Sequence, residues 1–241
     1  MIGDLYPSTL FPNGQVEQAV DKYCEQQSLP VPSYITEHKL RSLEDLKDHD
    51  YMVPTLEIQF LMFLVGILDV ETVLEIGCFT GYSALGFAEA LKNKPNAKIT
   101  TLEIDPKPIL IARKAFKGQP EAQIIEILGG DATASLNLLH GQSRSFDLIF
   151  LDANKEGYAD YFNKILDLQM LSPRGVLVVD NVLWRGLVAD RTPANPQGNE
   201  ISLAKAEVMD SFNKLVKADD RVEQLVLPLF DGLSLIRLKQ G

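Results

Sequence analysis

The sequence is poor in cysteine, histidine and tryptophan, and these shortages exclude whole classes of protein. Two cysteines, Cys24 and Cys78, cannot form the disulfide framework of a small secreted domain, so we interpret Cys78 as a packing residue. His38, His49 and His140 are scattered among polar residues and have no cysteine or histidine partner at zinc-site spacing. We therefore expect no zinc site and place the three histidines on the surface.

Long apolar runs and an excess of positive charge are also missing. The longest apolar run, residues 60–68, falls well below the roughly 18 residues that span a bilayer. The first residues, Met-Ile-Gly-Asp-Leu-Tyr, lack the basic and apolar blocks of a signal peptide. With 23 basic and 33 acidic side chains, the net charge of −10 repels nucleic acid. We expect a soluble, cytoplasmic protein that acts on small molecules and binds neither nucleic acid nor membrane.

Length and composition suit one domain over residues 1–241, because 46% of the side chains are hydrophobic. Apolar residues at helical spacing predict helices over 15–27, 34–48 and 55–68. We expect these helices to form an N-terminal cap within residues 1–70, ahead of a ligand-binding core over residues 71–241.

From residue 73 onward, strand-like and helix-like segments alternate, which is typical of parallel βαβ units. The predicted strands are 73–76, 98–104, 123–128, 146–151 and 175–179. The right-handed crossover rule then gives a doubly wound α/β sheet that binds ligands at the carboxyl ends of its strands.

The end of the chain departs from this alternation. A helix is predicted over 202–218, followed by strands over 222–229 and 233–238. Phe230, Asp231 and Gly232 join these two strands, and Asp-Gly between apolar runs indicates a β-hairpin.

The central motif is Val-Leu-Glu-Ile-Gly-Cys-Phe-Thr-Gly-Tyr-Ser over residues 73–83, which predicts a strand, a tight turn and a helix. Gly77 lets the backbone turn sharply and approach a ligand, and the first amides of the helix face the same crevice. The spacing is not that of a phosphate cradle, and Glu75 would repel a pyrophosphate. This carboxylate would instead attract a cation, such as the ammonium or sulfonium group of S-adenosylmethionine.

Polar residues follow the other predicted strands. Glu103 ends the second strand about 20 residues beyond the glycine turn, where an acid can accept both ribose hydroxyls. The third strand ends in Gly-Gly-Asp131-Ala132, which is compact enough for an adenine ring to lie against the backbone. Asp152 follows the fourth strand, and Asp180 with Asn181 follows the fifth.

Two carboxylates and one amide oxygen form a hard-ligand set that suits Mg²⁺, Ca²⁺ or Mn²⁺. The alternative is that Asp152 and Asp180 only cap the helices that follow them, because Asp is a common N-cap residue. Strand spacing by itself leaves both interpretations open.

Three segments together resemble the cation-dependent O-methyltransferases of the caffeoyl-CoA and catechol type. They are residues 73–83, Leu-Asp-Ala-Asn-Lys-Glu-Gly-Tyr at 151–158, and Val-Asp-Asn-Val-Leu-Trp-Arg-Gly at 179–186. The likeness extends from about Gln59 to the hairpin. It implies a class I methyltransferase fold with a seven-stranded sheet, S-adenosylmethionine as methyl donor, a divalent metal that holds a vicinal diphenol, and a homodimer.

Residue by residue, the resemblance makes Asp152, Asp180 and Asn181 the metal ligands and Lys155 the catalytic base. Trp184 and Arg185 fall on the acceptor side. The residues expected around the cofactor are Val53, Glu75, Gly77, Cys78, Ser83, Glu103, Ala132 and Asp152.

The chain departs from the family pattern at several positions. Asn154 replaces the usual acid of Asp-Ala-Asp-Lys, which leaves only a neutral acceptor there. Val53 stands where a hydroxyl residue is common, so a hydrogen bond to the cofactor would come from its backbone. Ile58 replaces a glycine, and Arg185 replaces a smaller polar residue; both alter the acceptor side, so coenzyme A thioesters are not assumed as substrates.

The expected chemistry is an in-line displacement on a sulfonium methyl by a deprotonated hydroxyl group. A divalent cation lowers the pKa of that hydroxyl and the pKa of Lys155, so the lysine can accept the proton. The alternative for Lys155 is a solvated lysine at a helix start, since lysines are usually exposed. Trp184 either walls the acceptor ring or packs beneath a loop, and we favour the wall.

Two other functions compete with methyl transfer. A nicotinamide-linked oxidoreductase would share a Rossmann-like fold, but the missing third glycine and Glu75 disfavour it. A catalytically inactive, methyltransferase-like binding protein is disfavoured because Asp152, Lys155, Asp180 and Asn181 are all present.

Overall fold

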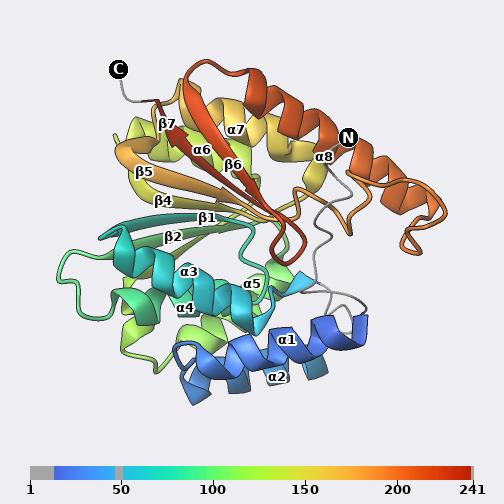
Figure 1. Cartoon of the computed structure of the whole chain (residues 1–241). Helices are drawn as coiled ribbons and strands as arrows, with labels where there is room; N and C mark the ends of the chain where they lie inside the picture. Colours follow the sequence, from blue (N-terminus) through green and yellow to red (C-terminus); the bar gives the residue numbers. More distant parts are fainter. Residues whose placement is uncertain (1–13, 47–50, 240–241) are drawn as a thin grey trace.

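The computed structural model describes residues 14–46 and 51–239, in which helices cover both faces of a central sheet (Figure 1). The predicted seven-stranded α/β sheet is confirmed, with strand order β3-β2-β1-β4-β5-β7-β6. Its strands are β1 Thr72–Ile76, β2 Lys98–Glu103, β3 Ile125–Gly129, β4 Phe146–Leu151, β5 Leu171–Val179, β6 Val222–Leu227 and β7 Leu233–Leu238.

Strands β1 to β5 run parallel, and the hairpin formed by β6 and β7 adds to β5 in antiparallel orientation. From β1 the chain proceeds outward to β2 and β3 on one side, then returns to β4 and β5 on the other. The carboxyl ends of the parallel strands meet at one edge, and the reversal of strand order beside β1 is where ligands bind in such sheets.

Each face of the sheet is covered by three helices with their own apolar core (Figure 1). On one face lie α3 Thr55–Ile67, α4 Tyr82–Leu91 and α5 Pro106–Phe116. On the other lie α6 Ala132–Gly141, α7 Tyr158–Asp167 and α8 Glu200–Ala218. Within the described ranges, no helix combines the length and the apolar character that crossing a membrane requires.

The predicted N-terminal helices are confirmed as α1 Gly14–Gln27, α2 Ser33–Asp45 and α3, although residues 47 and 48 of the second prediction lie outside the described residues. The side-chain amide of Gln59 on α3 donates to the carbonyls of Glu25 and Leu29 at 2.9 and 2.8 Å. These bonds fix the end of α1 against α3, so the first helices pack on the layer that contains α4.

The prediction that the histidines lie on the surface is wrong for His38, which is only 5% exposed. Helix α2 packs against the loop after β1, and His38 Nε2 lies 2.8 Å from the carbonyl oxygen of Thr80. Burial lowers the pKa of His38. His140 is exposed as predicted, and His49 lies outside the described residues.

The boundaries of β3, β5 and β6 differ from the predicted ones. Strand β6 ends at Leu227 instead of residue 229, because Pro228 has no N–H for the ladder. Residues predicted to start the third strand belong to a 3₁₀ helix, η2 Glu121–Ile124. Strand β5 begins earlier than predicted, since Leu171 pairs with Phe146 before a shift in register.

Gly77 is required by the packing of two loops. Its φ angle is +105°, and a Cβ atom there would lie 1.9 Å from the carbonyl oxygen of Asp152. The loop after β1 and the loop after β4 therefore touch backbone to backbone. A side chain at residue 77 would displace Asp152, one of the residues predicted to bind metal.

We predict that Gly77→Ala lowers the free energy of unfolding by about 2 kcal/mol or more, because both the φ angle and the contact with Asp152 resist a Cβ atom. Urea unfolding measures this change. The control is Gly66→Ala, since Gly66 lies in α3 with open space around it and should gain about 0.5–1 kcal/mol. Equal effects at the two positions would contradict the packing argument.

Candidate active site

The residues predicted to carry chemistry lie at the edge where the parallel strands end. Five of them lie at the end of a parallel strand or in the segment that follows it: Gly77, Glu103, Ala132, Asp152 and Asp180. Backbone bonds align the connections, since the amide of Asp152 donates to Ile76 O at 3.0 Å and that of Asp180 donates to Leu151 O at 3.1 Å. The topology brings together side chains that are far apart in the sequence.

Glu75 is fully buried near the end of β1, opposite Thr101 on β2. The hydroxyl of Thr101 donates to Glu75 Oε2, whereas Oε1 has no partner among the described residues. Burial raises the pKa of Glu75 to about 8, and hydrogen bonding from Ser83 and Thr101 opposes the rise. A buried acid with a free oxygen is suited to receive a cationic group.

The loop after β1 is attached to β2. The amides of Gly77 and Cys78 both donate to the carbonyl of Leu102 at 3.0 Å. Cys78 is buried, and burial raises the pKa of its thiol. Ser83 is also buried, in the first turn of α4. The Cys78 amide predicted to contact a cofactor thus has a partner in this structure.

Glu103 also holds the glycine loop. Its Oε2 accepts from the amide of Phe79 at 2.7 Å, and its Oε1 accepts from the amide of Asp105 at 2.9 Å. A carboxylate has further lone pairs, so the two bonds leave acceptor capacity for a diol. Ala132 begins α6, whose N-cap Asp131 accepts from the amide of Ala134 at 2.8 Å.

Val53 is buried just before α3, and its carbonyl accepts from Lys39 Nζ at 3.1 Å. The same ammonium lies 4.8 Å from the centroid of the Tyr82 ring. Helix α2 therefore holds both Val53 and the start of α4. The carbonyl of Val53 thus has an internal partner, and a backbone bond from Val53 to the cofactor stays a prediction.

Neither Asp152 nor Asp180 caps a helix among the described residues. Asn154 is the N-cap residue of the short η3 helix, Lys155–Gly157, and Gly157 is that of α7; neither cap has a side-chain bond. Asp180 Oδ1 accepts from its neighbour's amide, Asn181 N, at 2.6 Å. Burial and the charge of Asp152 raise the pKa of Asp180. The capping interpretation is not supported, and the metal-ligand role of the two residues stays a prediction.

Lys155 is buried, so the interpretation as a solvated lysine is wrong. It is 8% exposed, and its Nζ donates to Asp152 Oδ1 at 2.9 Å, Ala153 O at 3.0 Å and the Tyr158 hydroxyl at 2.7 Å. These three acceptors match the three protons of an ammonium group. Burial opposes the charge, yet Tyr158 and Asp152 raise the pKa of Lys155 overall.

Asn154 is exposed and accepts from the hydroxyl of Tyr161 at 2.8 Å. Its side chain is therefore turned toward α7 in this structure. Tyr158 and Tyr161 both pack in the core beneath the loop, and each also supplies a hydroxyl to it.

Sequence reasoning missed Asp231, which it interpreted only as a hairpin-turn residue. Asp231 Oδ2 accepts from Asn181 Nδ2 at 3.2 Å, and Oδ1 accepts from the backbone amide of Arg185. The bond to Nδ2 turns Asn181 Oδ1 away from Asp231 and leaves it available as a ligand. The hairpin tip thereby orients the third predicted metal ligand.

The loop after β5 is held in an unusual conformation. Asn181, Trp184 and Arg185 have φ angles of 61°, 41° and 58°, values that non-glycine residues rarely adopt. The hairpin sustains them, since Val182 N and Leu183 N donate to the carbonyls of the Asp-Gly turn at 3.0 and 3.1 Å. Such strain is typical of functional loops.

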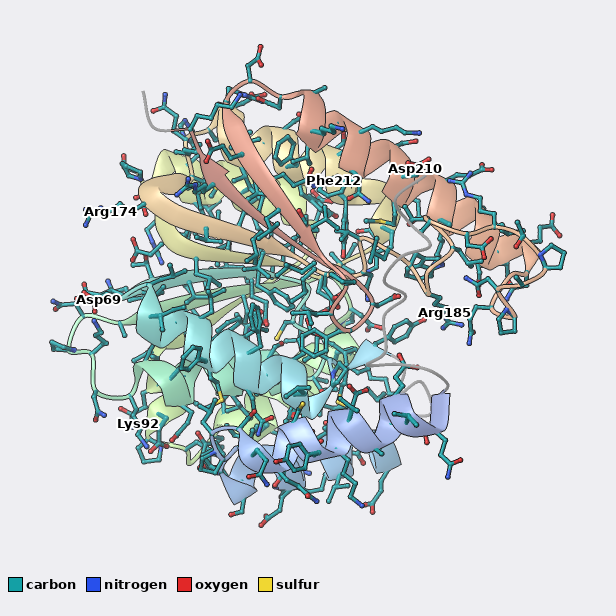
Figure 2. All side chains as sticks on the ribbon, in the orientation of Figure 1. Asp69, Lys92, Arg174, Arg185, Asp210 and Phe212 are labelled. Carbon is teal, nitrogen blue, oxygen red and sulfur yellow. The ribbon has the colours of Figure 1, made fainter. Side chains whose placement is uncertain are left out.

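Trp184 and Arg185 lie side by side at this loop. The Trp184 ring packs against the core, with Lys205 Nζ 5.0 Å from its centroid and the Arg185 guanidinium carbon at 5.9 Å. Its indole N–H has no partner among the described residues. Arg185 is exposed at the surface beside the hairpin turn (Figure 2). Trp184 thus packs on the core, and the acceptor-facing role of both residues stays a prediction.

A second missed residue is Glu57, the only charged residue of α3. It is fully buried, and neither carboxylate oxygen has a partner among the described residues. Burial and the charges of Asp180, Asp152 and Asp231 raise its pKa, while Lys155 opposes them. An acid between Leu56 and Ile58 was the available signal, since acids are almost never fully buried unless paired.

We call Glu57, Asp152, Asp180 and Asp231 the acidic cluster. Over residues 14–46 and 51–239, no three histidine, cysteine or acidic side chains lie close enough together to hold a metal ion by themselves. A metal at the predicted site would therefore require the amide oxygen of Asn181 as a third ligand.

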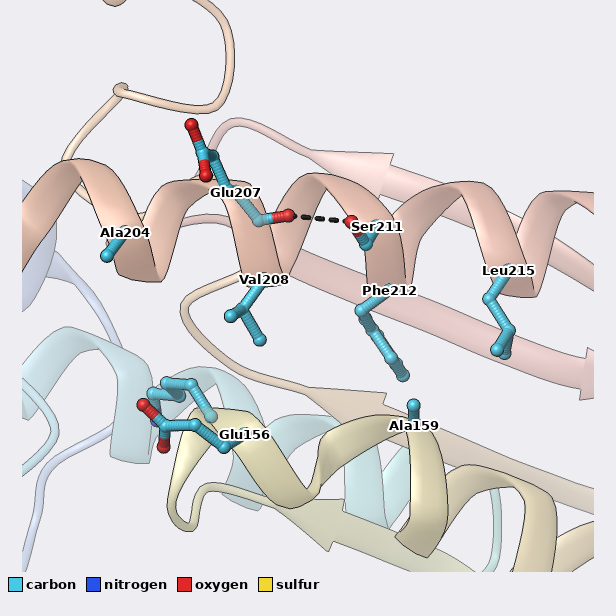
Figure 3. Close-up of a pocket in the computed structure, with 9 residues that line it drawn as sticks. Glu156, Ala159, Ala204, Glu207, Val208, Ser211, Phe212 and Leu215 are labelled. Atoms are coloured by element: carbon cyan, nitrogen blue, oxygen red, sulfur yellow. Dashed lines mark hydrogen bonds between the residues drawn. The ribbon is translucent and has the colours of Figure 1, made fainter.

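A surface groove of about 350 Å³ lies behind Lys155, between α7 and α8 (Figure 3). Its walls are mostly apolar and include two acids, Glu156 and Glu207. The residues that line it are Lys155, Glu156, Ala159, Ala204, Glu207, Val208, Ser211, Phe212 and Leu215. The predicted base Lys155 is among the lining residues of this groove, and none of the predicted cofactor, metal and acceptor residues is. The groove is thus distinct from the crevice at the strand ends.

Comparison with known sequences gives matches along most of the chain. A profile described as O-methyltransferase matches residues 30–239. The O-methyltransferase ankF of Aspergillus thermomutatus is 33% identical over 241 residues, which is 98% of this chain and 99% of the relative. The caffeoyl-CoA O-methyltransferase of Mesembryanthemum crystallinum is 35% identical over 184 residues, or 75% of this chain and 70% of the relative.

Solved structures match the fold as well. The SAH-bound methyltransferase PaMTH1 of Podospora anserina gives a TM-score of 0.89 at 35% identity, covering 97% of this chain and 100% of its own. The O-methyltransferase of Bacillus cereus in complex with SAH gives a TM-score of 0.77 at 28% identity, covering 92% and 97%.

The raised pKa of Glu75 yields a prediction for the ligand-free protein. Because the folded-state pKa of about 8 exceeds the ordinary value of 4.5, the folded state holds the proton more tightly. Glu75 should therefore cost stability as pH rises from about 4.5 through 8, and Glu75→Gln should remove that loss. Urea unfolding at pH 5 to 9 measures it, with the exposed Glu44→Gln as control. Parallel pH profiles for wild type and Glu75→Gln would contradict the assignment.

Proposed function

Since this chain belongs to the O-methyltransferase family and is an S-adenosylmethionine-dependent enzyme, we propose that it methylates one hydroxyl of a vicinal diphenol with the help of a divalent metal. The acceptor would be a catechol-like, flavonoid or hydroxycinnamoyl compound. Family membership removes the nicotinamide-linked oxidoreductase as an alternative. The homodimer and the cytoplasmic location stay predictions.

One observation carries this proposal: Asp152 and Asp180 end neighbouring parallel strands, and Lys155 Nζ lies 2.9 Å from Asp152 Oδ1. The donor set fits a hard divalent cation, because it combines two carboxylates with an amide oxygen that Asp231 leaves free. Asp152, Asp180 and Asn181 would hold the metal, with Mg²⁺ favoured over Ca²⁺ and Mn²⁺. The metal would lower the pKa of one acceptor hydroxyl and fix both hydroxyls in orientation.

The chain's own residues account for the remaining steps. Glu75 would receive the cationic methionine portion of S-adenosylmethionine, Glu103 the ribose hydroxyls, and Ala132 the adenine ring. Val53, Gly77, Cys78 and Ser83 would complete the cofactor site, with Asp152 at its border. The acceptor oxygen would then face the sulfonium methyl in line with the breaking C–S bond.

Lys155 would accept the proton of the reacting hydroxyl at Nζ. In the ligand-free structure it is an ammonium with three acceptors, so it must first lose a proton. A cation held by Asp152 would offset the carboxylate charge that stabilises this ammonium, and so would lower the pKa of Lys155. The Tyr158 hydroxyl, 2.7 Å from Nζ, keeps the lysine in place throughout.

We predict that product forms from vicinal diphenols only when a divalent metal is present. The test uses a panel of diphenols and their single-hydroxyl analogues, with Mg²⁺, with a chelator, and with the metal restored. Two adjacent hydroxyls are needed because bidentate coordination both acidifies and orients the acceptor. Turnover that survives chelation, or equal turnover of single-hydroxyl analogues, would refute the metal-dependent mechanism.

Lys155→Ala should lower kcat by about 10²–10⁴-fold, the range for loss of a general base, and leave the affinity for S-adenosylmethionine unchanged. Lys155→Arg should not restore activity, since arginine stays protonated. Lys164→Ala is the matched control, since Lys164 is a half-buried lysine of the following helix whose Nζ donates to Asn137 Oδ1. An active Lys155→Ala enzyme would exclude the lysine as the base.

A further inference from the structure

Glu57 has no structural partner to explain its burial. It lies in the first turn of the apolar helix α3, is fully buried, and has no bond from any described residue to either oxygen. A buried unpaired carboxylate costs several kcal/mol, so a purely structural residue would be apolar here. The burial of Glu57 therefore points to an interaction with a ligand.

The charges around Glu57 indicate the sign of that ligand. The acids whose charges act on it are Asp180, Asp152 and Asp231, and the cations that interact with it are Lys155 and Lys39. Lys155 is already hydrogen-bonded to Asp152. When all are ionised, the four carboxylates of the acidic cluster outnumber Lys155 and Lys39, and a cation relieves the remaining repulsion most directly.

We infer that Glu57 is an additional residue of the cation site that binds the water molecules of a divalent ion and not the ion itself. This inference rests on the proposed metal-dependent function. Glu57 does not join Asp152 and Asp180 as a third direct ligand, since no three of the described acidic side chains form a metal-binding group by themselves. Mg²⁺ usually keeps several of its waters, and the two free oxygens of Glu57 suit that role.

If Glu57 binds the waters of the ion, substituting it should change stability and metal affinity in opposite directions. Without a cation, Glu57→Gln removes a buried, unpaired acid whose ionisation the neighbouring acids oppose, and it should raise the melting temperature of the protein. With a cation, the same change removes an acceptor of the ion's waters, so divalent affinity should fall about tenfold or more. A residue that only packs would not move the two quantities in opposite directions.

The experiment titrates the cofactor-free protein with Mn²⁺ and follows free Mn²⁺ by electron paramagnetic resonance. Melting temperatures are measured with and without saturating Mn²⁺. We expect Glu57→Gln to show a higher melting temperature without metal, a Kd for Mn²⁺ raised about tenfold or more, and a smaller stabilisation by Mn²⁺. A Kd within twofold of wild type would overturn the inference.

Three further variants separate the possible failures. Glu57→Met, an apolar residue of similar length, should reproduce the weakened binding and serves if the glutamine variant does not fold. Asp180→Asn removes a proposed ligand and should abolish binding, whereas the exposed Glu44→Gln should change nothing. If wild type itself does not bind Mn²⁺, the metal-dependent function fails; if only Asp180→Asn loses binding, the role of Glu57 alone fails.

Discussion

Repulsion among buried and partly buried carboxylates is the constraint around which this edge of the molecule is built. Glu57, Asp152, Asp180 and Asp231 come from four separate parts of the chain, and their charges act on one another near the ammonium of Lys155. Folding brings these like charges together at a cost that the ligand-free protein bears. The apolar cores on both faces of the sheet supply the stability that makes this possible.

The geometry of the cluster depends on backbone contacts more than on side-chain pairs. Gly77 lets the loop after β1 touch the carbonyl of Asp152, and the hairpin turn holds the loop after β5 through Asp231. The left-handed conformations of Asn181 and Trp184 persist because that turn restrains them. Rigid backbone contacts of this kind hold functional side chains in the precise positions that catalysis requires.

The cofactor side of the crevice also depends on acids and backbone contacts, but it contains fewer charged groups. Glu75 lies in the interior with one free oxygen, and Glu103 accepts amides from the loop that it stabilises. Helix α2 closes this side from outside the sheet, since His38 and Lys39 bond to Thr80 and Val53. The N-terminal helices thus help position the crevice and do not merely cover it.

The sequence by itself determined the alternation of strands and helices, the glycine turn, the hairpin and the acids at the strand ends, because local periodicity and turn chemistry encode them. Only the tertiary structure decided that His38 and Lys155 are buried, that Asp231 orients Asn181, and that Glu57 belongs to the acidic cluster. Each of these depends on segments that are distant in sequence or on the depth at which a side chain is buried. A periodic pattern identifies the buried face of an element, but the partner on that face is fixed only when the layers pack.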